Sequence, residues 1–242
     1  MFTKNPLNEK VSDKTEYLDD FVEKYTYQDG KYLKKGLVGV VQKALSNAKL
    51  KKIYSKLSMK DSMDLTAKEV RVIKDYTLTG FRDINSFLYA QEQVYYNEYE
   101  KKWLKSKIDI LTECINKRIL GEQGIFYRGL SHGRAIFGSD VFHMSLEELK
   151  KKYEGKKLIN PGFSSVSVSK HVAENFSGGE NGVILEIALP KDTHALCVGS
   201  VGSYSKEEKE FILQRGTRFM IDKISYLNGK FRVKMTAVEV CY

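Results

Sequence analysis

The sequence predicts an α+β fold, with a mostly helical N-terminal half followed by a strand-rich C-terminal half. Two observations support this prediction. From residue 14 to about residue 120 apolar side chains recur at helical spacing, whereas from about residue 124 they form short β-branched or aromatic runs. The 242 residues are enough for one large domain or two small ones with a buried core.

Two segments of the N-terminal half carry the clearest helical patterns. Residues 66–89 begin with Thr66 and carry Glu69 three positions later, which is the pair that forms a capping box. Within this segment Gly80 predicts a break between two helices. A second helix is indicated by an apolar stripe at Leu104, Ile108, Leu111, Ile115 and Ile119.

The C-terminal half contains short runs with strand character, separated by turn residues. The runs cover residues 124–129, 158–169, 182–190, 194–199, 210–216, 217–224 and 231–241. Two helical segments, 145–155 and 169–176, interrupt them. We therefore expect a strand-rich core with helices packed on it.

The charge of the chain favours acidic partners without specifying one. The net charge is +9, and the excess is spread over both halves of the sequence. Such an excess attracts nucleotides, acidic proteins or anionic membranes. No run of Lys and Arg is long enough for a nucleic-acid-binding arm, so we predict no dedicated nucleic-acid partner.

The sequence shows no metal, membrane or export signal. Cys114, Cys197 and Cys241 lie far apart and the four His are scattered, so we expect no metal site. No stretch has the roughly 18–20 apolar residues of a membrane span. The N-terminus lacks the apolar region of a signal peptide. The protein is thus expected to act in a cytoplasm, to leave by another route, or to have had a leader removed.

Two of the predicted strands in the C-terminal half carry polar side chains within apolar runs. Arg128 lies in an apolar run beside Gly129 and needs an anion, either a carboxylate in an internal salt bridge or a ligand phosphate. Alternation along the next strand directs Ser165, Ser167 and Ser169 to one face. A solvated strand face is the alternative interpretation of that row.

Two further features of the C-terminal half are candidates for a functional site: a Gly-rich loop and a pair of acidic residues. Phe176 begins a Gly-rich loop that has neither P-loop nor dinucleotide-binding spacing. Glu208 and Glu210 lie two residues apart before an apolar run, and in an extended chain their side chains would share a face, roughly 7 Å apart. Ordinary surface charge is one alternative, and a register that uses Glu207 and Lys209 is another.

Arg128, the Ser row, the loop that begins at Phe176 and the Glu pair follow one another along the chain. In this order they form a pattern that resembles the mono-ADP-ribosyltransferases of the Arg–Ser–Glu class, which includes clostridial Rho-modifying exoenzymes and binary actin-modifying toxins. The resemblance covers residues 66–242 and is carried by four stretches. The first, LTAKEVRVIKDYTLTGFRDINSFL, is similar to the helical segment that those toxins carry before their first catalytic strand. The others are NPGFSSVSVS, in which Val166 replaces a family Thr, GVILEIALPKDTHAL and EKEFILQRGTRF.

The resemblance implies an N-terminal helical lobe followed by a core of two packed, mostly antiparallel sheets around an NAD cleft. Residues 1–60 would be a helical extension and residues 61–242 the catalytic domain. Within that domain residues 61–120 would form the helical lobe and residues 121–242 the β core. A single continuous domain remains the alternative.

The resemblance also implies roles for individual residues. Glu210 would be the catalytic carboxylate that stabilises the oxocarbenium-like transition state of NAD cleavage, and Ser165 would hold it in place. The NAD contacts would come from Arg128, Gly129, Asn85, Ser165, Phe176 and Glu210.

The acceptor side is implied by the turn before the catalytic strand. In this class a Glu at the position of Glu208 accompanies an arginine acceptor, whose guanidinium it would orient and deprotonate. Tyr204 would recognise the target protein. The implied partners are therefore NAD and a protein with an accessible arginine, with no metal.

Two departures from the family pattern concern phosphate binding. The loop at residues 177–180 contains no cation, and Tyr89 stands where the class often carries Arg. Weaker NAD binding would follow, unless Lys170 or Arg134 takes over.

Three functions stay open on the sequence. The first is an arginine-directed mono-ADP-ribosyltransferase that acts as a bacterial toxin, an effector delivered into a host cell, or a phage-encoded host modifier. The second is an NAD glycohydrolase on the same fold. The third is a non-enzymatic basic binding module.

Overall fold

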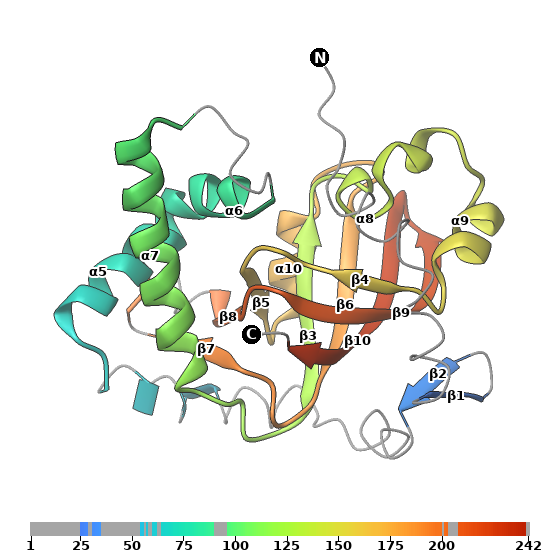
Figure 1. Ribbon diagram of the computed structural model, residues 1–242. Helices are drawn as coiled ribbons and strands as arrows, with labels where there is room; N and C mark the ends of the chain where they lie inside the picture. Colours follow the sequence, from blue (N-terminus) through green and yellow to red (C-terminus); the bar gives the residue numbers. More distant parts are fainter. Residues whose placement is uncertain are drawn as a thin grey trace.

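The structure of the protein is a computed structural model. It describes residues 25–28, 31–34, 54–55, 57, 60–61, 64–89, 96–199, 201–202 and 208–240. Among these residues a helical lobe packs against one end of a large, mostly antiparallel sheet (Figure 1). The α+β class predicted from the sequence is confirmed.

The helical lobe begins with helix α5 (Ala67–Asp75), a π-helical turn η1 (Tyr76–Gly80) and helix α6 (Phe81–Tyr89). The predicted capping box is present, since the Glu69 backbone N–H donates to Thr66 Oγ1 at 3.3 Å. Gly80 marks a change of helix type rather than a gap. A Cβ at Gly80 would lie 2.4 Å from Asp75 Oδ2 and 3.0 Å from the Asp75 carbonyl oxygen, so the Asp75 side chain would have to move to admit one.

Helix α7 (Glu98–Asn116) carries the predicted apolar stripe, and its members as far as Ile115 are buried. Ile119 does not belong to that stripe. It lies beyond the helix, in an isolated bridge to His194, and its side chain is 58% exposed. The prediction failed there because the helix ends at Asn116, before the apolar spacing ends.

The prediction of a mostly helical N-terminal half is wrong for one described segment. Strands β1 (Tyr25–Gln28) and β2 (Lys31–Lys34) form an antiparallel pair. In the sequence they are separated by Asp29-Gly30, a dipeptide that strongly favours a two-residue hairpin turn. That signal was therefore available in the sequence.

The sheet of the C-terminal half contains eight strands in the order β4-β9-β10-β6-β3-β5-β8-β7. Their bounds are β3 Gly124–Leu130, β4 Lys157–Ile159, β5 Ser164–Ser167, β6 Val183–Leu189, β7 Ala195–Cys197, β8 Glu210–Leu213, β9 Thr217–Leu227 and β10 Lys230–Val240. Neighbours are antiparallel except for the parallel pair β10–β6.

The expected division into two packed sheets is not confirmed, because these strands are hydrogen-bonded in one continuous order. The sheet is nevertheless far from flat. In Figure 1, β9 and β4 run crosswise to β3 and β6, and the β9–β10 ladder contains two register shifts. Such irregularities increase local twist and bend a sheet.

Short helices cover the sheet at two places. Helix α8 (Arg134–Phe137), the 3₁₀ turn η2 (Gly138–Phe142) and helix α9 (Leu146–Tyr153) lie near the β9 side (Figure 1). Helix α10 (Lys170–Phe176) packs against β3. The two helical segments predicted at 145–155 and 169–176 are thus confirmed, whereas α8 and η2 were not predicted.

Two hydrophobic clusters meet at strand β8. Phe211 and Leu213 belong to the main core between the sheet, α8 and α9. Ile212 belongs to a second cluster, which also contains Phe163 of the segment before β5 and the buried faces of α5, α6 and α7. The helical lobe therefore packs on the face of β8 that carries Ile212.

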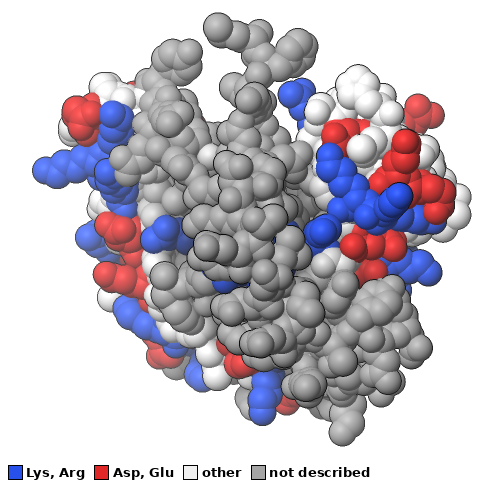
Figure 2. All heavy atoms as spheres, turned by 45° about the vertical axis from the view of Figure 1, so that its right-hand side comes forward, with Lys and Arg blue, Asp and Glu red and all other residues white. Residues whose placement is uncertain are grey.

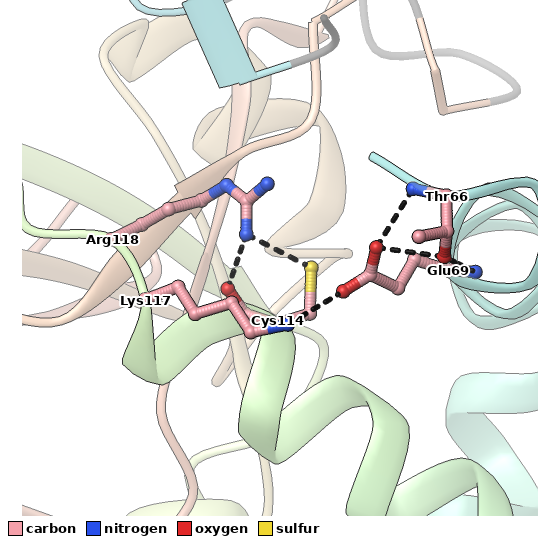
Figure 3. Close-up of polar contacts among 5 residues, drawn as sticks. All are labelled: Thr66, Glu69, Cys114, Lys117 and Arg118. Atoms are coloured by element: carbon pink, nitrogen blue, oxygen red, sulfur yellow. Dashed lines mark hydrogen bonds and ion pairs between the residues drawn. The ribbon is translucent and has the colours of Figure 1, made fainter. Parts of the chain in front are cut away.

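A polar network fixes the base of the lobe (Figure 3). Glu69 accepts a hydrogen bond from the Thr66 backbone N–H at 2.8 Å and pairs with Lys117 at 3.3 Å. Next to it, Arg118 Nη1 donates to the Cys114 carbonyl oxygen at 2.5 Å. These contacts join the start of α5 to the end of α7.

The surface carries charges of both signs. On the face that Figure 2 shows, Lys and Arg side chains are interspersed with Asp and Glu over the described residues. Within the part of the chain that the structure describes, no helix combines the length and apolar character of a membrane span.

Candidate active site

Strands β5 and β8 bring the predicted Ser and Glu together. They pair antiparallel, with Ser165 opposite Ile212 and Ser167 opposite Glu210. Ser165 and Ile212 share a face because they are directly opposite, and Glu210 lies two residues before Ile212 on the same strand. This is the face on which the helical lobe packs. Ser165 and Glu210 therefore lie between the sheet and the lobe.

Glu210 is a buried carboxyl group with an unusual proton affinity. Its side chain and backbone together are only 6% exposed. Burial raises the pKa of Glu210 to about 7, helped by the negative charge of Glu208. A hydrogen bond from the Ser165 side chain and the positive charge of Arg128 act in the opposite direction and lower the pKa. Desolvation is the larger effect.

Glu208 does not lie on strand β8. Strand β8 begins at Glu210, and the intervening Lys209 has a φ of 48°, in the left-handed region. The expectation that both carboxylates share the face of one extended chain is therefore wrong in its geometry. Their electrostatic coupling is nevertheless present, because Glu208 raises the pKa of Glu210. Residue Glu207, the basis of the alternative register, lies outside the described residues.

Ser167 fixes the backbone at the turn. Its hydroxyl donates to the Glu208 carbonyl oxygen at 2.5 Å and accepts from the Ser169 backbone N–H at 2.9 Å. Ser167 is 4% exposed, so the interpretation of the Ser row as a solvated face fails at this position. Its role is to connect the end of β5 to the start of β8.

Arg128 is a half-buried cation beside the pair. Its Nη1 donates to the Ser165 carbonyl oxygen at 3.2 Å. Burial raises the pKa of Tyr76 and Tyr89, and the nearby Arg128 charge partly offsets this in both. The guanidinium therefore lies among two phenols, a backbone carbonyl and the Glu210 carboxyl.

Gly129 allows helix α10 to approach β3 closely. A Cβ at Gly129 would lie 2.0 Å from the Ala173 carbonyl oxygen and 2.7 Å from the Ser177 backbone nitrogen. This contact places Phe176, the last residue of α10, which is 56% exposed to solvent. An exposed aromatic ring on a tightly held helix end can stack on a ligand.

Asn85 is engaged within the protein. Its Oδ1 accepts from the Phe163 backbone N–H at 2.9 Å, and its Nδ2 donates to the Phe163 carbonyl oxygen at 3.2 Å. The same Nδ2 also lies 3.3 Å from the Tyr76 hydroxyl. A direct contact from Asn85 to a nucleotide stays a prediction, as does the role of Tyr204, which lies outside the described residues.

The structure shows one cation at the Gly-rich loop that the sequence reasoning missed. Lys230 of β10 donates to Ser177 Oγ at 2.6 Å. Lys170, expected as a replacement cation, pairs with Glu174 at 3.7 Å. The sequence offered no signal for Lys230, because it follows the loop by about fifty residues and reaches it only through the parallel pairing of β10 with β6.

Tyr54 is a second residue that the sequence reasoning missed. It is 7% exposed and stacks edge-on against Phe211 with ring centroids 5.6 Å apart. Burial raises the pKa of Tyr54, and the charge of Glu210 adds to the rise. Among the described residues, the titratable and charged groups that interact with Glu210 include Glu208, Arg128, Tyr54 and Tyr76.

A family model described as ADP-ribosyltransferase exoenzyme matches residues 42–241. The chain belongs to the ADP-ribosyltransferase exoenzyme family. The resemblance stated from the sequence is thereby confirmed.

A curated relative is similar in sequence. The NAD(+)–arginine ADP-ribosyltransferase EFV of Enterococcus faecalis is 30% identical over 164 residues, which are 65% of this chain and 29% of that protein. The chain thus spans under a third of the relative's length.

Two solved structures are similar in fold. Plx2a, an ADP-ribosyltransferase toxin from Paenibacillus larvae, has a TM-score of 0.67 at 25% identity and covers 81% of this chain and 98% of its own. C3stau2 from S. aureus, solved with NAD, has a TM-score of 0.65 at 18% identity and covers 81% and 98%. Over the described residues of the chain, no group of three His, Cys, Asp or Glu side chains could hold a metal ion.

Proposed function

We propose that this protein is a mono-ADP-ribosyltransferase that cleaves NAD at the nicotinamide bond and transfers ADP-ribose to a protein arginine. The observation that carries the proposal is the buried Glu210, held by Ser165 and coupled to both Arg128 and Glu208. A carboxyl group removed from water, next to one cation and one further carboxylate, lowers the stability of the fold, and carboxyl groups perturbed in this way cluster at functional sites.

The first half of the reaction needs a carboxylate and little else. The bond from ribose C1 to the nicotinamide nitrogen breaks, and its electron pair neutralises the pyridinium ring, so no proton donor is needed. Positive charge then develops on the ribose, as in glycoside hydrolysis. Ionised Glu210 stabilises that charge in a site that excludes water, where such an interaction is strong. Ser165 keeps the carboxylate oriented.

The second half of the reaction is assigned to Glu208. A guanidinium nitrogen of the acceptor attacks C1, and its proton passes to the Glu208 carboxylate. Three observations support an arginine acceptor: Glu208 precedes Glu210 by two residues, it is electrostatically coupled to Glu210, and the relative EFV is named an arginine ADP-ribosyltransferase.

The remaining predicted contacts serve NAD and the target. Arg128 binds the diphosphate and Phe176 stacks on nicotinamide. The Gly129 backbone lines the NAD site between these two residues in the sequence. Lys230 at the Gly-rich loop is a candidate for a further phosphate contact, in place of the expected Lys170. Tyr204 and Asn85 keep the roles that the resemblance implied. We also propose that the protein acts as a toxin or effector, secreted or delivered into a host cell.

The test uses NAD labelled on the adenylate side, incubated with the chain and a mixed cell lysate, with nicotinamide release followed in parallel. Wild type is compared with Glu208→Gln, Glu210→Gln and the matched control Glu122→Gln, whose side chain lies on the exposed surface. We expect labelled protein bands that neutral hydroxylamine removes and mercuric ion does not. Glu210→Gln should lose bands and release together, whereas Glu208→Gln should lose the bands and keep release.

The other outcomes discriminate between functions. Nicotinamide release by the wild type without any labelled band, across several lysates, would favour an NAD glycohydrolase. Neither bands nor release from the folded chain would refute an NAD-cleaving enzyme and leave a binding module.

A further inference from the structure

Helix α6 directs two side chains at the segment that leads into strand β5. Asn85 and Tyr89 are four residues apart and therefore lie on one face of the helix. Both contact the segment 160–164, which precedes Ser165. Together they hold its two ends against the helical lobe.

The contact at Asn85 is made to the backbone and is tight. The Asn85 amide brackets the N–H and the carbonyl oxygen of Phe163, as a neighbouring strand would. A Cβ at Gly162 would lie 2.6 Å from Asn85 Oδ1. This end of the segment therefore has almost no freedom relative to α6.

The contact at Tyr89 passes through a second amide. The Tyr89 hydroxyl donates to Asn160 Oδ1 at 2.6 Å, and Asn160 Nδ2 donates to Ser164 Oγ. The Asn160 backbone is itself anchored, with its N–H on the Thr217 carbonyl oxygen at 3.0 Å and its own carbonyl oxygen accepting from the Gly216 N–H at 2.7 Å.

The Asn160 amide lies between two hydroxyl groups. Its oxygen accepts from Tyr89 and its NH₂ group donates to Ser164. A hydroxyl group can partner either side of an amide, so the two contacts together hold the Asn160 side chain in place. Without the Tyr89 hydroxyl the amide loses one of these two partners and restrains Ser164 less.

Ser164 is directly followed by the residue on which the site depends. The Ser165 carbonyl oxygen accepts from Arg128 at 3.2 Å, and the Ser165 side chain hydrogen-bonds Glu210. Resting on the proposed function, we propose that Tyr89 is a positioning residue. Through Asn160 and Ser164 it sets the position of Ser165, and thereby the alignment of Arg128 and Glu210, without contacting NAD itself.

The first test is Tyr89→Phe, which keeps the ring and removes only the hydroxyl, with Tyr99→Phe as the matched control because Tyr99 is 80% exposed on α7. We expect kcat for nicotinamide release to fall roughly ten- to a hundredfold, as small misplacements of reacting groups do, with KM for NAD changed less than about twofold. A raised KM with unchanged kcat would overturn the proposal, since Tyr89 would then contact NAD directly. An effect no larger than that of the control would overturn it as well.

The second test asks whether the residues act as one chain of contacts. Ser164→Ala and the double variant with Tyr89→Phe are measured together with the single variants. If Tyr89 acts through Ser164, the double variant should be no slower than the slower single variant. Effects on kcat that multiply in the double variant would contradict the relay.

A third measurement separates failure of this proposal from failure of the proposed function. If the wild type releases no nicotinamide, the function fails, and Tyr89 is then judged by the titration of the Glu210 carboxyl carbon in NMR, assigned with Glu210→Gln. The midpoint should rise in Tyr89→Phe, because a weakened Ser165 hydrogen bond no longer lowers the pKa of Glu210. An unchanged midpoint overturns the positioning role.

Discussion

At the residue scale the site depends on one carboxyl group that the fold holds out of water. Glu210 gains a hydrogen bond from Ser165 and a favourable charge from Arg128, yet burial raises its pKa to about 7. Near neutral pH the group is therefore divided between its two protonation states. Its ionised form is the one that can stabilise positive charge on the ribose. Stability and activity should respond to pH in opposite directions.

The stability prediction follows from linkage. The pKa of Glu210 is higher in the folded chain than its unperturbed value of 4.5, so between pH 4.5 and 7 the folded state binds more protons than the unfolded state. The stability contribution of Glu210 is thus fully present below pH 4.5 and is lost as pH rises towards 7. The loss is on the order of 3 kcal/mol.

Chemical denaturation of wild type and Glu210→Gln across this range checks the prediction. The neutral Gln cannot titrate, so the free energy of unfolding of the variant, relative to wild type, should increase steadily from pH 4.5 to 7. A difference that stays constant with pH would show that Glu210 ionises normally in the folded chain.

The activity prediction concerns the coupling of the two carboxylates. In wild type, kcat/KM for nicotinamide release should fall as pH drops below about 7, where free Glu210 becomes protonated. Glu208→Gln removes a like charge that raises the pKa of Glu210. The acid limb of its profile should therefore move to lower pH, by a few tenths of a unit to one unit. An unmoved acid limb in this variant would mean that the carboxylates are not coupled.

At the element scale the packing of α10 on β3 positions the exposed Phe176. The approach is so close that only a residue without Cβ fits at Gly129. Strand β3 and helix α10 are not consecutive in the chain, because α8, η2, α9, β4 and β5 lie between them. Their contact is therefore made by tertiary packing. It links the strand that carries Arg128 to the helix that carries Phe176.

Gly129→Ala should therefore displace α10. The added Cβ would overlap the Ala173 carbonyl oxygen at 2.0 Å, and we expect a loss of about 1–3 kcal/mol in the free energy of unfolding. KM for NAD should rise, because Phe176 moves with the helix. Gly179→Ala is the matched control, since a Cβ there meets no atom within 4 Å. Equal effects of the two substitutions on thermal melting would argue against the tight contact.

At the scale of the whole molecule the helical lobe and the sheet are joined by buried polar contacts as well as by apolar ones. Asp61 Oδ2 accepts from the Cys197 backbone N–H at 3.0 Å, and Asp61 Oδ1 lies 3.7 Å from Arg118 Nε. Both side chains of this ion pair are nearly buried, at 10% and 8% exposed. Through Asp61, Arg118, two residues beyond the end of α7, is connected to strand β7.

Asp61→Ala should be strongly destabilising because Arg118 cannot lose its proton and would remain buried without a counter-charge. Breaking a buried pair in this way costs about 3–5 kcal/mol. Asp64→Ala, at an exposed position three residues away, should change the free energy of unfolding by less than about 0.5 kcal/mol. A melting temperature for Asp61→Ala equal to that of the control would show that the pair does not hold the lobe.

Much of the fold could be predicted from the sequence because its causes are local. The capping box at Thr66 lies within four residues, the stripe on α7 within one helix, and the alternation in β5 within one strand. These local signals determined the α+β class. The candidate site residues were singled out by their order along the chain, which resembles the family pattern, and their roles stay predictions.

What only the tertiary structure decided depends on contacts between distant residues. Glu208 leaves the strand because Ser167, from another strand, holds its carbonyl oxygen and Lys209 takes a left-handed conformation. The Tyr89–Asn160 contact joins residues 71 positions apart, and Lys230 reaches Ser177 across 53. Glu210 loses its contact with water only when the helical lobe packs on the sheet. No spacing in a linear sequence carries such information, because the energy of these contacts exists only once the chain has folded.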